Sequence, residues 1–181
     1  DLSNGPNRGT IYINWTDQRN GVNNTDVWLI KSQDGGATWS APRRVNDDNS
    51  NRHQFLTWMT VDQTDGHLYF VFYDRRNHGG DSTDVYVAES IDGGNHFINH
   101  LISESPFVPD ASIFFGDYNN ITASNGIVRP IWTRLNKGKL SKWTDIRSYN
   151  KGAVTSVHAP VTDMSFENYP NPSDHMTYVS F

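Results

Sequence analysis

Two segments of the chain repeat one pattern of charged side chains. Each has two aspartates and an arginine around a loop rich in Asn and Gly, so that each Asp pair should meet across a hairpin mouth. The sets are Asp17, Arg19 and Asp26, and, 57 to 58 residues later, Asp74, Arg76 and Asp84. An arginine beside two carboxylates can bridge them and fix the loop. The alternative is a calcium site that adds loop carbonyls and Asn23 to the four aspartates. Because both sets already contain an arginine, we favour the bridge, and no cofactor is required.

A second pattern, Ser-x-Asp-x-Gly-x-x-aromatic, occurs twice at a spacing of 58 residues. In such a turn the aspartate accepts hydrogen bonds from backbone N–H groups two or three residues on, and the glycines permit a positive φ. The aromatic residue is expected to pack between neighbouring sheets, so the predicted role is structural. The copies comprise Ser32, Asp34, Gly35, Gly36 and Trp39, and Ser90, Asp92, Gly93, Gly94 and Phe97.

This motif resembles the Asp box, or BNR repeat, of sialidases and related β-propellers. A third, divergent unit runs from Phe115 to Trp143 without an Asp box, and Arg134 stands where the first two units have Asp17 and Asp74. The resemblance implies a partial β-propeller of about three blades out of six, with the Asp boxes on the outer rim, away from an active site. Because propellers need about four to eight blades to close, the missing blades are expected upstream.

The fold class expected from these repeats is all-β, with almost no helix. The propeller blades are assigned to residues 1–149, a linker to 150–164 and the start of a C-terminal β-sandwich to 165–181. Aromatic and β-branched residues between turn signals predict the strands of the first two blades. These strands are 10–17, 27–32, 38–45, 56–62, 67–74, 84–90 and 95–103.

Composition narrows the function classes. The net charge of −5 and the scattered Lys and Arg residues exclude a basic face for sequence-independent nucleic-acid binding. No apolar run reaches membrane-spanning length. The absence of Cys excludes disulfides and thiolate metal sites. Aromatic residues make up 13% of the chain, which suits sheets that pack face to face.

The last segment contains a short proline motif, Tyr169, Pro170, Asn171 and Pro172. After it, Met176, Tyr178 and Ser180 alternate with Thr177, Val179 and Phe181, as the two faces of a strand would. The two prolines would hold the chain extended as it enters a strand. The motif resembles the opening of a type A sorting domain of the type IX secretion system. That resemblance implies the type IX machinery as a partner, and a location in the medium or on the outer cell surface, reached through the periplasm. The alternative is an ordinary proline-rich turn between domains.

The resemblance also implies a central channel, to which three polar residues are assigned. Asp117 and Tyr118 should lie at the start of an inner strand, and Asp62 ends the matching strand of the preceding blade. Such side chains can bind sugar hydroxyls, a cation or a catalytic water, or close the channel by hydrogen bonding. Trp58 and Tyr118 offer stacking faces for sugars, although core packing is the alternative for both.

No catalytic residue is assigned. Sialidases hold a carboxylate with three arginines and use a Tyr nucleophile, a Glu and an Asp, but the Phe-Arg-Ile-Pro element of the first arginine is absent here. Glu89, on the strand before the second Asp box, is expected to face solvent. Two functions are therefore expected: a non-catalytic glycan-binding or adhesive propeller, which we favour, or an exo-sialidase or related glycoside hydrolase with its catalytic residues in missing blades.

Overall fold

The computed structural model describes residues 1–136, 138–145, 147–150 and 153–156. Within these ranges every regular element is a strand and there is no helix, which confirms the all-β class. The strands are β1 (Ile11–Asp17), β2 (Asp26–Ser32), β3 (Arg43–Arg44), β4 (Gln54–Val61), β5 (Leu68–Asp74), β6 (Asp84–Ser90), β7 (Ile98–Leu101), β8 (Asn120–Ser124), β9 (Ile127–Asn136), β10 (Lys139–Thr144), β11 (Arg147–Asn150) and β12 (Ala153–Ser156).

The strands form three antiparallel sheets, none of which closes on itself. The first sheet has the order β1-β2-β3 and the middle sheet the order β4-β5-β6-β7. The third sheet has the order β10-β9-β11-β12, with β8 also paired to β9. Consecutive strands are therefore mostly neighbours joined by hairpin turns, as their short connections predict.

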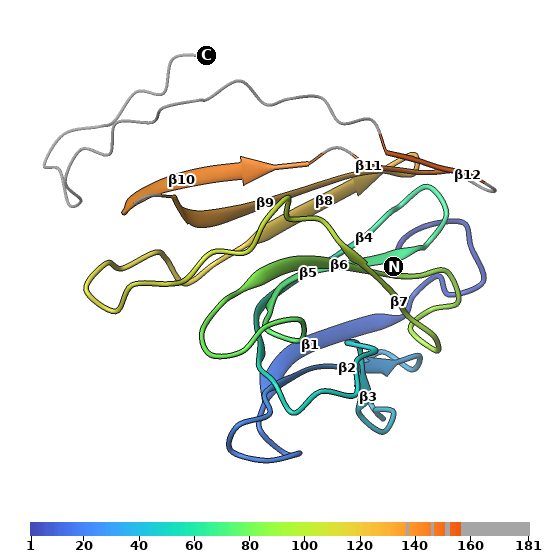
Figure 1. Cartoon of the computed structure of the whole chain (residues 1–181). Coiled ribbons are helices and arrows are strands. Elements are labelled where there is room, and N and C mark those ends of the chain that lie inside the picture. Colours follow the sequence, from blue (N-terminus) through green and yellow to red (C-terminus); the bar gives the residue numbers. More distant parts are fainter. Residues whose placement is uncertain (137, 146, 151–152, 157–181) are drawn as a thin grey trace, which may run out of the picture.

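The middle sheet lies between the other two (Figure 1). All seven residues of β5 are buried, because alternate side chains of a strand point to opposite faces and both faces are covered. Leu68, Phe70 and Phe72 pack with the first sheet. Tyr69 and Tyr73 pack with the third sheet. The two apolar interfaces hold the three sheets in one stack.

The register supports the internal repeat read from the sequence. In each sheet an aromatic residue near the end of one strand lies opposite another on the next strand, and such cross-strand pairs stabilise hairpins. The pairs are Trp15 with Trp28, Phe72 with Tyr86, and Trp132 with Trp143.

Several predicted strands are shorter than expected. The prediction over 38–45 is reduced to β3, because Thr38 still belongs to the Asp-box turn. The prediction over 95–103 is reduced to β7, since Asn95 and His96 bond to the second box. Strand β12 lies inside the range 150–164 that was predicted as a linker, and it pairs with β11.

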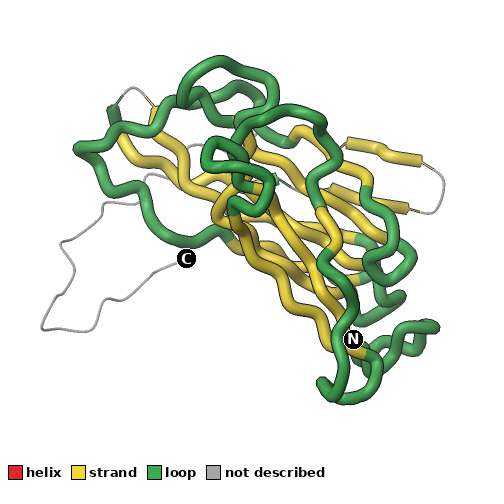
Figure 2. Tube along the Cα trace, turned by 90° about the horizontal axis from the view of Figure 1, so that it is seen from below, coloured by secondary structure: helices red, strands yellow, loops and turns green. Residues whose placement is uncertain are grey.

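The stack has two ends, with the strands running between them (Figure 2). At one end, here named the box end, lie both Asp boxes and the turns after β4 and β8. At the other, here named the loop end, lie the β1–β2 and β5–β6 loops and the segments that enter β4 and β8.

Candidate functional site

The first Asp box forms the predicted turn. Ser32 Oγ donates to Asp34 Oδ1 at 2.8 Å and accepts from the Gly36 N–H at 2.9 Å. Thr38 N–H donates to Asp34 Oδ1 at 2.9 Å, one residue further along than expected. Hydrogen bonds from the Thr38 side chain and backbone hold the pKa of Asp34 at about 2. Gly35 has φ +73° and Gly36 φ +95°, which favour glycine.

The second Asp box repeats this geometry. Ser90 Oγ donates to Asp92 Oδ1 at 2.9 Å and accepts from Gly94 N–H at 2.9 Å. Asn95 and His96 donate their backbone N–H groups to the same carboxylate oxygen at 2.9 and 3.0 Å. Partial burial raises the pKa of Asp92, but bonds from His96, Ser90 and Asn95 outweigh it and lower the pKa to about 2. As in the first box, Gly93 and Gly94 adopt positive φ.

The two box aromatics have different surroundings. Phe97 packs against the core between the first and middle sheets, with its ring centroid 5.7 Å from that of Phe70. Trp39 is 40% exposed, although it was predicted to pack between sheets. It belongs to the first sheet's hairpin, where the described residues supply no preceding sheet to cover it.

The hairpin mouths bring the predicted aspartates together. Asp17 lies directly opposite Asp26, and Asp74 directly opposite Asp84. The predicted arginine bridges do not form across them, because each arginine turns back to the first aspartate of its own set. Arg19 Nε lies 2.9 Å from Asp17 Oδ1.

In the second mouth, Arg76 binds away from Asp84. Its Nε donates to Asp74 Oδ2 at 2.8 Å, and its Nη1 donates to Asp47 Oδ1 at 2.6 Å. Asp74 is fully buried, and Gln54 Nε2 donates to it at 3.2 Å. The ion pair therefore joins the β5–β6 loop to the segment before β4.

The second aspartate of each set has other partners: Arg44 Nη1 lies 3.6 Å from Asp26 Oδ1, and the remaining contacts come from neutral donors and a histidine. Asn20 and Asn46 donate to Asp26, each at 2.7 Å. His78 Nε2 lies 2.8 Å from Asp84 Oδ2, and Ser103 Oγ donates to Asp84 Oδ1 at 3.1 Å. Among the residues with a described position, no group of three or more His, Asp or Glu side chains is arranged to hold a metal ion. A calcium site at Asp17, Asp26, Asp74 and Asp84 stays a prediction.

The three predicted channel residues do not form one cluster. Asp62 is buried at the box end, where it accepts from Thr64 N–H at 2.9 Å and from Gly126 N–H at 2.8 Å. It therefore ties the middle sheet to the third sheet. Asp117 and Tyr118 lie beyond the opposite end of β8, in the segment that enters the strand.

Tyr118 instead meets Trp58 of β4. Their rings are edge to face, with centroids 6.4 Å apart, and both side chains are open to solvent at 76% and 41% exposure. The pair lines a hollow of about 390 Å³. The polar side chains in that hollow are Asn119, Asn120, Thr133 and Lys142.

A bulge in β4 sets the position of Trp58. The pairing of β4 with β5 shifts register between Phe55 and Trp58, and Leu56 has φ +50°, which is unusual for a branched side chain. Asn119 Nδ2 donates to the Leu56 carbonyl at 2.9 Å, so the segment entering β8 holds the bulge. No glycine or asparagine in the sequence signals this bulge, because tertiary contacts hold it.

Glu89 and Asp117 are two further polar residues considered in the sequence. Glu89, expected to face solvent, has a side chain that is only 15% exposed. Tyr69 donates to Glu89 Oε1 at 3.4 Å, and His100 Nε2 lies 3.9 Å from Glu89 Oε2. Asp117 lines a different hollow, of about 600 Å³, together with Arg75 and Asp81.

The structure describes no helix that is both long and apolar enough to cross a membrane. The predicted sorting motif, Tyr169 to Pro172, lies outside the described residues. Comparison of the chain with models of known protein families found no match, and comparison with curated proteins also found none.

Proposed function

We propose that this chain is part of a secreted or cell-surface, sialidase-like Asp-box β-propeller that binds glycans. Two Asp boxes with the same hydrogen bonds support the proposal. So do the three antiparallel sheets stacked face to face, each of which has a cross-strand pair of aromatic residues.

The observation that carries the binding role is the exposed pair of Trp58 and Tyr118. Large aromatic side chains bury apolar area when they find a partner, so two that stay open at a hollow indicate a binding surface. A sugar ring presents C–H groups on its faces and hydroxyls at its edge. Trp58 suits the ring face, and the amide of Asn120 with the Lys142 ammonium suits the hydroxyls.

Titration of the protein with neutral oligosaccharides, followed by NMR or calorimetry, tests this role. Trp58→Ala should weaken binding roughly two- to twelvefold, since an aromatic contact contributes about 0.5–1.5 kcal/mol. Trp39→Ala is the matched control, because Trp39 is equally exposed but lies at the box end. Equal losses in both variants, or no binding by the unmodified chain, would refute the site. Cleavage of the sugar during titration would favour the hydrolase alternative.

Export is a separate part of the proposal and rests on the sequence alone. The Tyr169, Pro170, Asn171 and Pro172 motif suits a sorting domain read by the type IX secretion machinery. A glycan-binding protein has its ligands outside the cell, so binding and export agree with each other.

A further inference from the structure

The bulge in β4 decides which face of the middle sheet carries Trp58. In a regular strand, residues three positions apart point to opposite faces. Phe55 and Trp58 are three positions apart, but both pair with residues of β5 that pack against the third sheet, Tyr73 and Val71 respectively. The extra residue in β4 therefore turns Trp58 toward the third sheet, where Tyr118 lies before β8. In a regular β4 the indole would face the first sheet, away from Tyr118.

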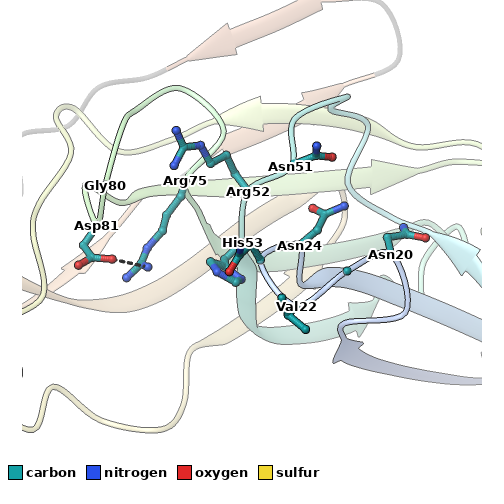
Figure 3. A pocket seen from close by; sticks show the side chains of 11 residues that line it. Asn20, Val22, Asn24, Asn51, Arg52, His53, Arg75, Gly80 and Asp81 are labelled. Atoms are coloured by element: carbon teal, nitrogen blue, oxygen red, sulfur yellow. Dashed lines mark hydrogen bonds and ion pairs between the residues drawn. The ribbon is translucent and has the colours of Figure 1, made fainter.

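The start of β4 is fixed from the loop end, so the strand cannot remove the bulge by sliding. Gln54 is fully buried, and its N–H donates to the Thr25 carbonyl at 2.7 Å. The Phe55 ring centroid lies 5.1 Å from the guanidinium carbon of Arg75. Figure 3 shows Arg75 paired with Asp81, 2.7 Å away, in the lining of a hollow of about 630 Å³. The extra residue is therefore accommodated further along the strand.

Two unfavourable features meet at the bulge. Leu56 has φ +50°, in the left-handed region that costs free energy for a residue with a Cβ. Asn119 is 3% exposed, and its Oδ1 is buried without a hydrogen-bond partner among the described residues. The Nδ2 of the same amide donates to the Leu56 carbonyl at 2.9 Å, so one bond joins the two features. Strained backbone and unsatisfied buried groups concentrate at functional positions, which indicates a function for this bulge.

A second amide holds the bulge from the opposite sheet. Asn14 Nδ2, on β1, donates to Thr57 Oγ1 at 3.0 Å. Asn14 belongs to the first sheet, whereas Asn119 comes directly before β8 of the third sheet. Both neighbouring sheets therefore hold one residue of the bulge. Because Asn119 directly follows Tyr118, its bond to Leu56 also ties the tyrosine's segment to the strand that carries the indole.

We propose that Asn119 and Asn14 are positioning residues for the Trp58–Tyr118 pair, because they hold the strained bulge in the geometry that presents the indole to a sugar ring. That the ligand is a glycan rests on the proposed function, whereas the placement of the indole does not. Asn119 Nδ2 is committed to the Leu56 carbonyl, so this amide acts through Trp58 and not by touching the sugar. The affinity of the site then depends on Asn14, a residue of another sheet.

Substitutions that remove a hydrogen bond but keep the shape of the side chain test this role. Asn119→Leu removes the donor to Leu56, and Thr57→Val removes the acceptor of Asn14. Calorimetric titration with a neutral galactose trimer should show weaker binding in both variants, by no more than the roughly two- to twelvefold expected for Trp58→Ala. Without ligand, the NOE between the Trp58 and Tyr118 rings, whose centroids lie 6.4 Å apart, should also weaken.

Leu56→Gly supplies a readout that a general loss of stability would not move. Glycine adopts positive φ without strain, so the bulge should keep its geometry without the Asn119 amide. In the Leu56→Gly background, Asn119→Leu should therefore leave the affinity nearly unchanged. Asn99→Ala is the matched control, because it removes an amide bond to the Val45 carbonyl, of 3.0 Å, at β7 on the far edge of the middle sheet. It should lower stability without weakening the sugar.

The outcomes separate this inference from the proposed function. Unchanged affinity and an unchanged NOE in both Asn119→Leu and Thr57→Val would overturn it. So would equal losses of affinity from Asn119→Leu with and without Leu56→Gly, since the loss would then follow from destabilisation alone. If the unmodified chain binds no oligosaccharide, but the NOE depends on both amides and is restored by Leu56→Gly, the positioning role stands and the glycan role fails.

Discussion

Arg76 stacks on Tyr86, with the guanidinium carbon 4.3 Å from the ring centroid, while the same group binds the buried carboxylate of Asp74. Arg19 lies at the same distance from Trp28 in the first sheet. In the third sheet Arg134 covers Trp143 at 4.9 Å, although it comes from a different position of the repeat. A cation over the cross-strand aromatic is thus common to all three sheets.

Arg76→Met should destabilise the protein far more than Arg19→Met. Asp74 is fully buried and the Arg76 side chain is 12% exposed, so loss of the arginine leaves an unpaired buried charge at a cost of about 3–5 kcal/mol. Arg19 and Asp17 are 37% and 32% exposed, and such a pair contributes about 0–1 kcal/mol. Urea unfolding of the two variants measures the difference, and equal losses would contradict it.

Asp92→Ala should lower the free energy of unfolding by about 1–3 kcal/mol without changing ligand affinity. The carboxylate accepts from two backbone N–H groups and from Ser90, all at the box end. Asp34→Ala should act in the same way. Thermal unfolding checks the loss of stability, and ligand titration of the same sample checks the unchanged affinity. Abolished binding at unchanged stability would refute the structural role.

Stability should fall as the pH drops from about 4 toward 2. The folded pKa values of Asp34 and Asp92 are about 2, below the ordinary value of 3.8. As the pH falls, the two carboxylates therefore bind protons at a higher pH in the unfolded chain than in the folded one. Their contribution to stability is complete above the unfolded pKa and is lost as the pH falls through the folded pKa. The double variant Asp34→Asn, Asp92→Asn should show a shallower loss in acid urea titrations. An identical pH profile would disprove the assignment.

Chelation should leave the melting temperature unchanged. Each of the four hairpin-mouth aspartates already has a hydrogen-bond donor from the protein, such as Trp15 Nε1 at 2.8 Å from Asp17 Oδ2. A calcium ion bound only to the native state would raise the melting temperature by mass action. Calorimetry with EDTA and then with added CaCl₂ checks this. A drop on chelation that calcium reverses would establish the ion instead.

A reporter with a signal peptide, fused to Ser165 and the residues that follow through the native C-terminus, should leave the periplasm in a host with the type IX system. Recognition then depends on the sorting domain and not on the sheets. The matched fusion replaces Pro170 and Pro172 with Ala, which removes the constraint on the chain. If export is lost in a host that lacks the type IX system, the result supports the assignment of these residues to a sorting domain. A stable reporter kept in the periplasm argues for an ordinary turn.

The hairpins and boxes were predictable because their interactions are local. Ser32, Asp34 and Gly36 bond within five residues of one another, and the opposed aspartates follow from hairpin register. Strand alternation likewise placed β5 and β6 to within a residue. Such features depend on residue types that lie near each other in the chain.

The candidate sites needed the packed sheets. Trp58 meets Tyr118 across 60 positions, and the bulge at Leu56 is held by Asn119, so neither has a local signal. Burial divides residues that look equivalent in the repeat: Phe97 lies between two sheets, while Trp39 stays open. Repetition predicts which side chain faces a neighbour, but only the assembled stack decides whether a neighbour covers it, because burial depends on contacts between distant strands.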